Sequence, residues 1–215
     1  MRLVSVNVSS GTVVQWRGRP VETGIFKQPV AGRVMVRGTN VDGDRQADLT
    51  VHGGEYKAVY AYAAEHYDWW RRELRRDIPY GMFGENLTTE GLPEQETCVG
   101  DIFQVGRARL QAVQPRLPCF KLGLRFRDAS MVRRFMDSGR LGIYFRIVAE
   151  GEIGAGDEVA WVHRDPTRLP VPELARLLVS PDRDPEAVRR ALGVPALPPE
   201  WAATLQRGRQ PGYSA

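Results

Sequence analysis

Residues 114–119, with the sequence QPRLPC, place a cysteine shortly after an arginine that two prolines bracket. The prolines restrict the backbone on both sides of Arg116, so the thiol of Cys119 is expected to be held in one position. Arg116 is a permanent cation, and a cation near a thiol favours the thiolate form. A fixed thiolate suits a soft metal ligand, a nucleophile or a sulfur carrier. The residues alone leave these three roles open.

Residues 51–54, with the sequence VHGG, have the composition of an anion-binding loop. Two consecutive glycines, Gly53 and Gly54, let backbone amides point together into a concavity, and His52 or Lys57 adds charge. A plain turn with a surface histidine explains the same residues. Neither the Walker loop nor the dinucleotide-binding fingerprint is present in the sequence.

A third candidate is the segment 83–87, with the sequence FGENL. Asn86 can donate and accept hydrogen bonds at once, which suits the edge of a heterocycle, and Glu85 can accept from ring nitrogens. Asn86 is equally able to close its own turn. Lys27 and Arg33 are candidate phosphate partners, with solvated surface charges as the alternative.

The other cysteine, Cys98, is predicted to be a packed or partly exposed thiol without a role in the chemistry. The sequence has no CxxC pair and its histidines are not at zinc-finger spacing, which argues against a structural zinc site. It also lacks the GxSxG pattern of many esterases.

Short alternating segments with turns rich in Gly and Asp predict that residues 1–164 form a mainly β domain, a barrel or a sandwich. Two helices are expected within it, at 63–76 and 128–139, and the aromatic stripe of the first, including Tyr67 and Trp70, is predicted to be core. The expected strands are 3–8, 12–15, 32–37, 56–62, 102–105, 109–113, 142–149 and 158–162.

The pattern changes after Asp165 and Pro166. Residues 171–179, 185–192 and 199–206 are predicted helices separated by proline-rich joints, and no strand pattern remains. The sequence therefore predicts two domains, a β domain over 1–164 and a small three-helix appendage over 165–215.

Composition limits the kinds of partner. The chain has 215 residues, 42% of them hydrophobic and 26% charged, with a formal net charge of +4. Its basic residues are interleaved with acidic ones, which favours a small anionic ligand over a nucleic acid. Two cysteines exclude a disulfide framework. No segment has the pattern of a signal peptide or a membrane span, so the expected location is cytoplasmic, with no membrane partner.

Taken in order, these motifs resemble the MOSC domain, named after the C-terminal domain of molybdenum cofactor sulfurases. The likeness is greatest to the stand-alone bacterial YiiM-type branch, whose members carry a C-terminal three-helix module. It covers about 160 residues. The motifs that carry it are Gly43-Asp44-x-Gln46-Ala47, His52-Gly53-Gly54-x-x-Lys57-Ala58, Gly84-Glu85-Asn86-Leu87, Gly100-Asp101, Gln114-Pro115-Arg116-x-Pro118-Cys119, Gly142 and Gly151.

The resemblance implies a β-barrel-like domain that binds the molybdenum cofactor, a phosphorylated pterin dithiolene. It implies that Cys119 ligates molybdenum and takes part in catalysis, the reduction of N-hydroxylated compounds such as hydroxylaminopurine-like base analogues. The cofactor-binding residues it implies are Lys27, His52, Gly53, Gly54, Lys57, Glu85, Asn86, Arg116 and Pro118.

The resemblance also bears on the electron donor of such a reductase and leaves an alternative function open. The chain has no flavin or iron–sulfur motif, so such a reductase needs electrons from a separate flavoprotein or iron–sulfur protein. It also lacks an aminotransferase-like domain, so its chemistry would not use pyridoxal phosphate. The alternative is a module that carries the cofactor, or sulfur as a persulfide on Cys119, without turnover.

Overall fold

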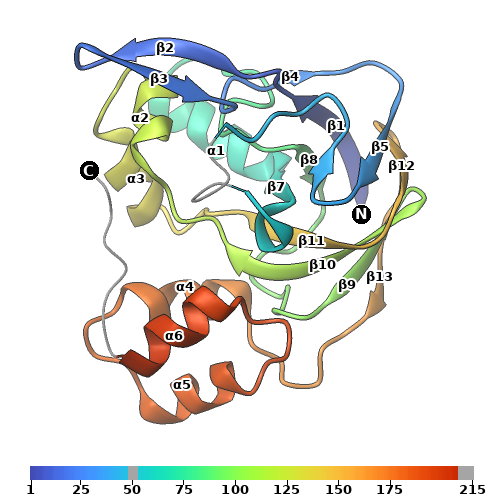
Figure 1. Ribbon diagram of the computed structural model, residues 1–215, viewed down its shortest axis with the longest axis vertical. Helices are drawn as coiled ribbons and strands as arrows, with labels where there is room; N and C mark the ends of the chain where they lie inside the picture. The colour runs from blue at the N-terminus through green and yellow to red at the C-terminus, as the bar shows by residue number, and fades with distance from the viewer. Residues whose placement is uncertain (48–52, 208–215) are drawn as a thin grey trace.

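The computed structural model describes residues 1–47 and 53–207. Its largest element is an eight-stranded sheet (Figure 1). In spatial order the strands are β13 (Val159–His163), β9 (Ile102–Val105), β10 (Ala108–Pro115), β11 (Ile143–Ala149), β7 (Val59–Ala63), β8 (Leu87–Glu90), β1 (Arg2–Val8) and β4 (Gln28–Pro29). Every pairing in this sheet is antiparallel except that of β7 with β8, which are parallel because helix α1 (Ala64–Leu74) connects them.

Two smaller sheets flank the large one. The first contains β12 (Gly151–Gly154), β5 (Arg33–Arg37) and β6 (Asn40–Val41), and the second is the hairpin of β2 (Thr12–Trp16) and β3 (Arg19–Thr23). The mainly β class with a C-terminal three-helix module is therefore confirmed. Among the described residues the large sheet keeps two edge strands, β13 and β4, so it is open and not closed into a barrel.

In the described residues of the β-rich part there is one more α-helix than the two that the sequence predicts. Besides α1 and α3 (Met131–Asp137), helix α2 (Phe120–Phe126) begins directly after Cys119 and ends at Arg127, which is left-handed with φ 55°. The sequence pattern did not predict α2, because Gly123, a poor helix former, lies in the middle of this helix. A Cβ atom there would lie 3.1 Å from Ala129 Cα, so close packing explains this glycine.

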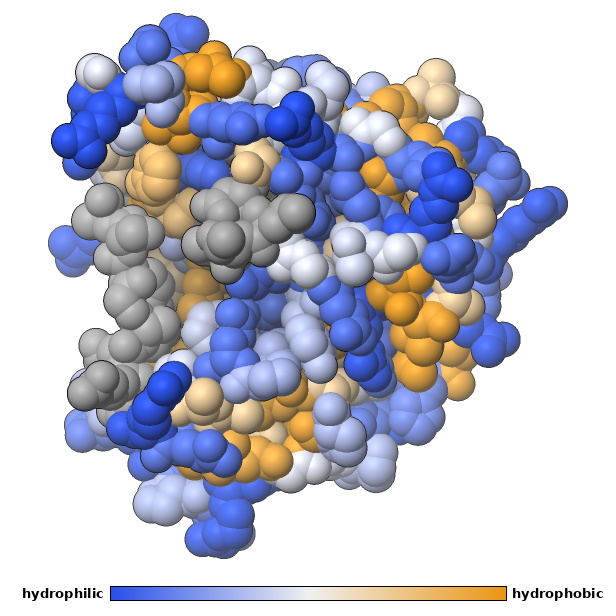
Figure 2. All heavy atoms as spheres, viewed as in Figure 1, coloured by the Kyte–Doolittle hydropathy of each residue, from blue (hydrophilic) through white to orange (hydrophobic). Residues whose placement is uncertain are grey.

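Helix α1 and the strands beneath it form an aromatic core. Tyr67 and Trp70 are fully buried, which confirms that the aromatic stripe is core. Their polar atoms are paired: the Trp70 indole donates to the Tyr62 hydroxyl at 2.8 Å. The face seen in Figure 2 is mostly hydrophilic, with hydrophobic residues in separate patches.

The buried tyrosines predict a response to alkali. Burial raises the pKa values of Tyr60, Tyr62, Tyr67 and Tyr144 above the ordinary tyrosine value. Above about pH 10 the unfolded chain then binds fewer protons than the native one, so stability falls as pH rises. Absorbance of tyrosinate at 295 nm from the fully buried Tyr60, Tyr62 and Tyr67 is expected to appear only together with loss of the native circular dichroism. Their ionisation in a chain that keeps its native spectrum would contradict the prediction.

The C-terminal module consists of α4 (Val171–Val179), α5 (Pro185–Leu192) and α6 (Pro199–Arg207), and α4 packs against β10. Buried leucines of α4, including Leu174 and Leu178, belong to the same hydrophobic cluster as the sheet. Asp101 accepts a hydrogen bond from the Asp165 amide at 2.8 Å and pairs with Arg164 at 3.2 Å, which ties the connecting segment to the sheet. The boundary at 164/165 stays a prediction. No helix in the described ranges is both long enough and apolar enough to cross a membrane.

Candidate functional site

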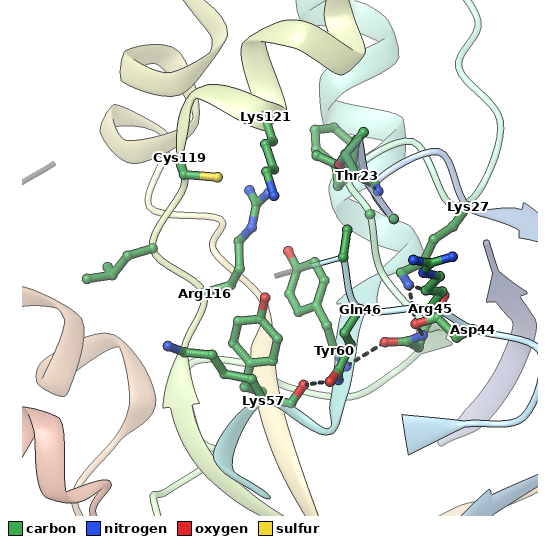
Figure 3. A pocket seen from close by; sticks show the side chains of 18 residues that line it. Thr23, Lys27, Asp44, Arg45, Gln46, Lys57, Tyr60, Arg116, Cys119 and Lys121 are labelled. Atoms are coloured by element: carbon green, nitrogen blue, oxygen red, sulfur yellow. Dashed lines mark hydrogen bonds and ion pairs between the residues drawn. The ribbon is translucent and has the colours of Figure 1, made fainter. Parts of the chain in front are cut away.

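A pocket opens where the segments after β3, after β6, before β7 and after β10 meet (Figure 3). It includes about 660 Å³ of empty space, part of it continuous with solvent. Five of the residues predicted from sequence line it, together with several that were not predicted. The predicted ones are Lys27, Lys57, Asn86, Arg116 and Cys119, and the others include Thr23, Asp44, Arg45, Gln46, Tyr60, Lys121 and Tyr144.

Cys119 occupies the N-cap position of α2 in an extended conformation, with φ −124° and ψ 175°. Its side chain is half-buried and its Sγ points into the pocket, on the same side as Lys121 (Figure 3). Because β10 ends at Pro115 and α2 begins at Phe120, the thiol lies on a short connection between two regular elements. That the thiol is held in one position stays a prediction.

Arg116 is buried, and only 6% of its surface is exposed. Its guanidinium lies 5.0 Å from the ring centroid of Phe135 and 5.6 Å from that of Tyr60. These cation–π contacts stabilise part of its charge. Among the described residues, its Nη1 atom has no hydrogen-bond partner. A buried donor without a partner is costly, and in a pocket it indicates a place for an acceptor on a ligand.

Two tyrosine rings, tilted by 37° to each other, form another wall. The ring centroids of Tyr60 and Tyr144 are 5.1 Å apart, and the two residues are direct partners in the pairing of β7 with β11. Burial is the main cause of the raised pKa of Tyr144, and Arg116 opposes it. The Tyr60 hydroxyl already donates to the Leu141 carbonyl at 2.9 Å, so of these two phenols it is that of Tyr144 that can donate a hydrogen bond to a ligand.

The floor of the pocket is an ion pair. Lys27 Nζ lies 2.5 Å from both carboxylate oxygens of Asp44, which also accept from Asn86 Nδ2 and from the Ser9 amide, each at 2.9 Å. Burial lowers the pKa of Lys27, and Asp44 opposes the shift. The Asp44 carboxylate thus largely offsets the charge of Lys27 within the floor of the pocket. Asn86 connects this ion pair to β7: its Nδ2 donates to Asp44, and its Oδ1 accepts from the Tyr60 amide at 3.1 Å.

Glu85 faces away from the pocket. It is fully buried and accepts hydrogen bonds from the Gly81 amide at 2.7 Å, the Thr88 hydroxyl at 3.0 Å and the Phe83 amide at 3.2 Å. The Tyr67 hydroxyl donates to it as well. Four donors converge on this carboxylate, so in the structure it closes the turn that carries Asn86 and contributes no surface to the pocket.

A Glu85→Gln variant is expected to be less stable than the wild type by about 1–3 kcal/mol, because an amide NH₂ would then meet a backbone donor. Burial raises the pKa of Glu85 even though its donors oppose this. A raised folded-state pKa gives stability that is present in acid and lost as pH rises through that value. The difference between wild type and variant in urea unfolding should therefore be larger near pH 4.5 than at pH 7. A difference that grows with pH would contradict this.

None of the remaining predicted residues that the structure describes lines the pocket. Gly54 has φ +88° and immediately precedes the 3₁₀ helix η1 (Glu55–Lys57); it and Gly53 are outside the pocket lining. Pro118 is buried beside Cys119 and does not line the pocket. His52 lies outside the described residues. The helix η1 replaces the start of the strand expected at 56–62, and the Lys57 carbonyl accepts from Gln46 Nε2 at 3.1 Å.

Arg33, the other candidate phosphate partner, pairs with Asp157 at 2.8 Å and is not part of the pocket lining. Among the residues that sequence reasoning missed, Asp44 had a visible signal, since the Gly43-Asp44 motif was recognised without a role being given to it. Tyr60 and Tyr144 had none, because aromatic residues in strands are typical of core.

Comparison with known proteins identifies the family. The MOSC domain matches residues 48–160. The chain belongs to the MOSC domain family. In this MOSC protein, residues 169–207 match the YiiM-like, 3-alpha helix domain, which confirms the predicted branch.

Its relatives include the uncharacterized protein YflK of Bacillus subtilis, 37% identical over 205 residues, which are 95% of this chain and 93% of that protein. A protein of Gibberella moniliformis named a reductase is 33% identical over 165 residues, 75% of this chain and 29% of that protein. The crystal structure of YiiM from Geobacillus stearothermophilus matches with a TM-score of 0.79 and 32% identity, covering 96% of this chain and 98% of that one.

Proposed function

We propose that this MOSC protein binds the molybdenum cofactor in the pocket and reduces N-hydroxylated compounds, such as hydroxylaminopurine-like base analogues, to amines. The observation that carries the proposal is the buried Nη1 of Arg116, a donor without a partner in a pocket that Cys119 also lines. A cysteine sulfur, which is a soft ligand, near a guanidinium with one unpaired donor fits a molybdenum dithiolene that carries a phosphate.

The residues present fit this group in two ways. Cys119 would supply one thiolate to the metal, and Arg116, with Lys121 on the pocket wall, would face the anionic parts of the cofactor. Lys27 would attract the anionic cofactor less than a free lysine, because it is paired with Asp44. Asn86 would act mainly by fixing that pair in place.

The chemistry is a cleavage of an N–O bond. Reduction of a hydroxylamino compound to an amine consumes two electrons and two protons and releases water. The bound cofactor would supply the two-electron change at molybdenum. The protein would orient the substrate against the aromatic wall of Tyr60 and Tyr144 and provide charge. Electrons would come from a separate flavoprotein or iron–sulfur protein.

Membership of the MOSC family and the relative named a reductase support this function. The test is elemental mass spectrometry of full-length protein that has been co-expressed with an ample cofactor pathway. It is followed by an assay of hydroxylaminopurine reduction with reduced methyl viologen as electron source. Near-stoichiometric molybdenum and amine formation are expected. Persulfide mass on Cys119 with no bound metal would instead establish the carrier function.

A further inference from the structure

The first turn of α6, in the C-terminal module, contacts two of the segments that form the pocket. The Glu200 carboxylate lies 3.1 Å from Lys57 Nζ. The Trp201 indole donates to Gln114 Oε1, and Gln114 Nε2 donates to the Tyr56 carbonyl at 2.8 Å. One helical turn thus contacts η1 and the end of β10 together.

These contacts lie beside the groups that the pocket uses. Gln114 is only 1% exposed and is two residues before Arg116 in the chain. Lys57 lines the pocket, yet its side chain extends toward the C-terminal helices and away from Arg116 (Figure 3). Its side chain is 18% exposed and that of Glu200 is 50% exposed, so the pair lies at the rim.

We propose that Glu200 and Trp201 are positioning residues through which the three-helix module controls anion binding in the pocket. Glu200 draws the Lys57 ammonium to the rim and offsets its charge. Trp201 fixes Gln114, and through it the segments that carry Lys57 and Arg116. The inference rests on the proposed function only in treating the pocket as a site for an anionic group.

The two residues should have opposite effects, which a purely structural role would not give. Removing the charge of Glu200 takes a negative charge away from the Lys57 ammonium and from the pocket rim, so anion affinity should rise. A Trp201→Phe change removes the indole donor, leaves buried Gln114 Oε1 unpaired and loosens the wall, so affinity should fall.

The experiment is a calorimetric titration of inorganic pyrophosphate into the full-length protein. Glu200→Gln is expected to bind about 2–5-fold more tightly than wild type, the range of a partly exposed ion pair. Trp201→Phe is expected to bind about 5–10-fold more weakly. Glu173→Gln is the matched control, because Glu173 pairs with Arg190 inside the same module and its loss changes the net charge equally. In a Lys57→Met background, Glu200→Gln should have no effect.

Three results would overturn the inference: equal affinities of wild type and Glu200→Gln, a Glu200→Gln effect that persists without Lys57, or no pyrophosphate binding to the wild type. Thermal unfolding of each variant shows that the binding is measured on folded protein. The titration needs neither metal nor turnover. Failure of the proposed reductase would instead appear as wild-type protein without molybdenum, so the two failures are distinguishable.

Discussion

A Cys119→Ala variant is expected to lose more than about nine-tenths of the molybdenum that the wild type retains after co-expression with the cofactor pathway. Loss of a ligand should exceed the 10–100-fold effects of groups that merely orient ligands. Cys119 is the thiol that lines the pocket. Elemental mass spectrometry on purified protein measures the effect directly.

The matched control is Cys98→Ala, which removes the other thiol of the chain. Cys98 is buried outside the pocket lining, and burial, with Asp101 nearby, raises its pKa, so it is a poor metal ligand. This variant should keep its molybdenum. Full metal content in Cys119→Ala, or equal losses in both variants, would exclude Cys119 as the ligand.

Much of the architecture could be predicted because its signals are local. The predicted bounds of alternating strands such as β1 and β11, and of the C-terminal helices, differ from the observed ones by one residue or less. Strand β8 was missed, and only its first residue, Leu87, lies in the segment 83–87 that the sequence analysis considered. Its pairing partner, β7, is separated from it by helix α1 and the turn that Glu85 closes, and no local pattern encodes a pairing over that distance.

The site was predicted unevenly for a similar reason. The sequence identified Arg116 and Cys119, which are close in the chain and lie in one short segment. It could not show that neighbouring Glu85 and Asn86 face opposite ways, one into the core and one toward the pocket. Nor could it show that Asp44 meets Lys27, because the two are seventeen positions apart and only the fold brings them together.

Replacement of Asp44 by alanine is expected to destabilise the protein by about 3–5 kcal/mol, the cost of leaving one member of a buried ion pair without its partner. The side chains of Lys27 and Asp44 are 8% and 2% exposed, so water cannot replace the lost carboxylate easily. The Asn86 amide and the Ser9 N–H also lose an acceptor. Urea unfolding measures the change, and Asp42→Ala, which breaks the exposed pair with Arg37, should cost less than about 1 kcal/mol.

Two further measurements separate the charge effect from simple loss of packing. A Lys27→Met/Asp44→Ala double variant should recover much of the lost stability, because no unpaired charge then remains buried. Burial lowers the pKa of Lys27, so below pH 10.5 the unfolded chain binds more protons than the native one. The contribution of Lys27 to stability must then increase as pH rises toward 10.5, and Asp44→Ala should lose least there. A loss that is independent of pH and is not relieved by Lys27→Met would show that Asp44 acts by hydrogen bonding alone.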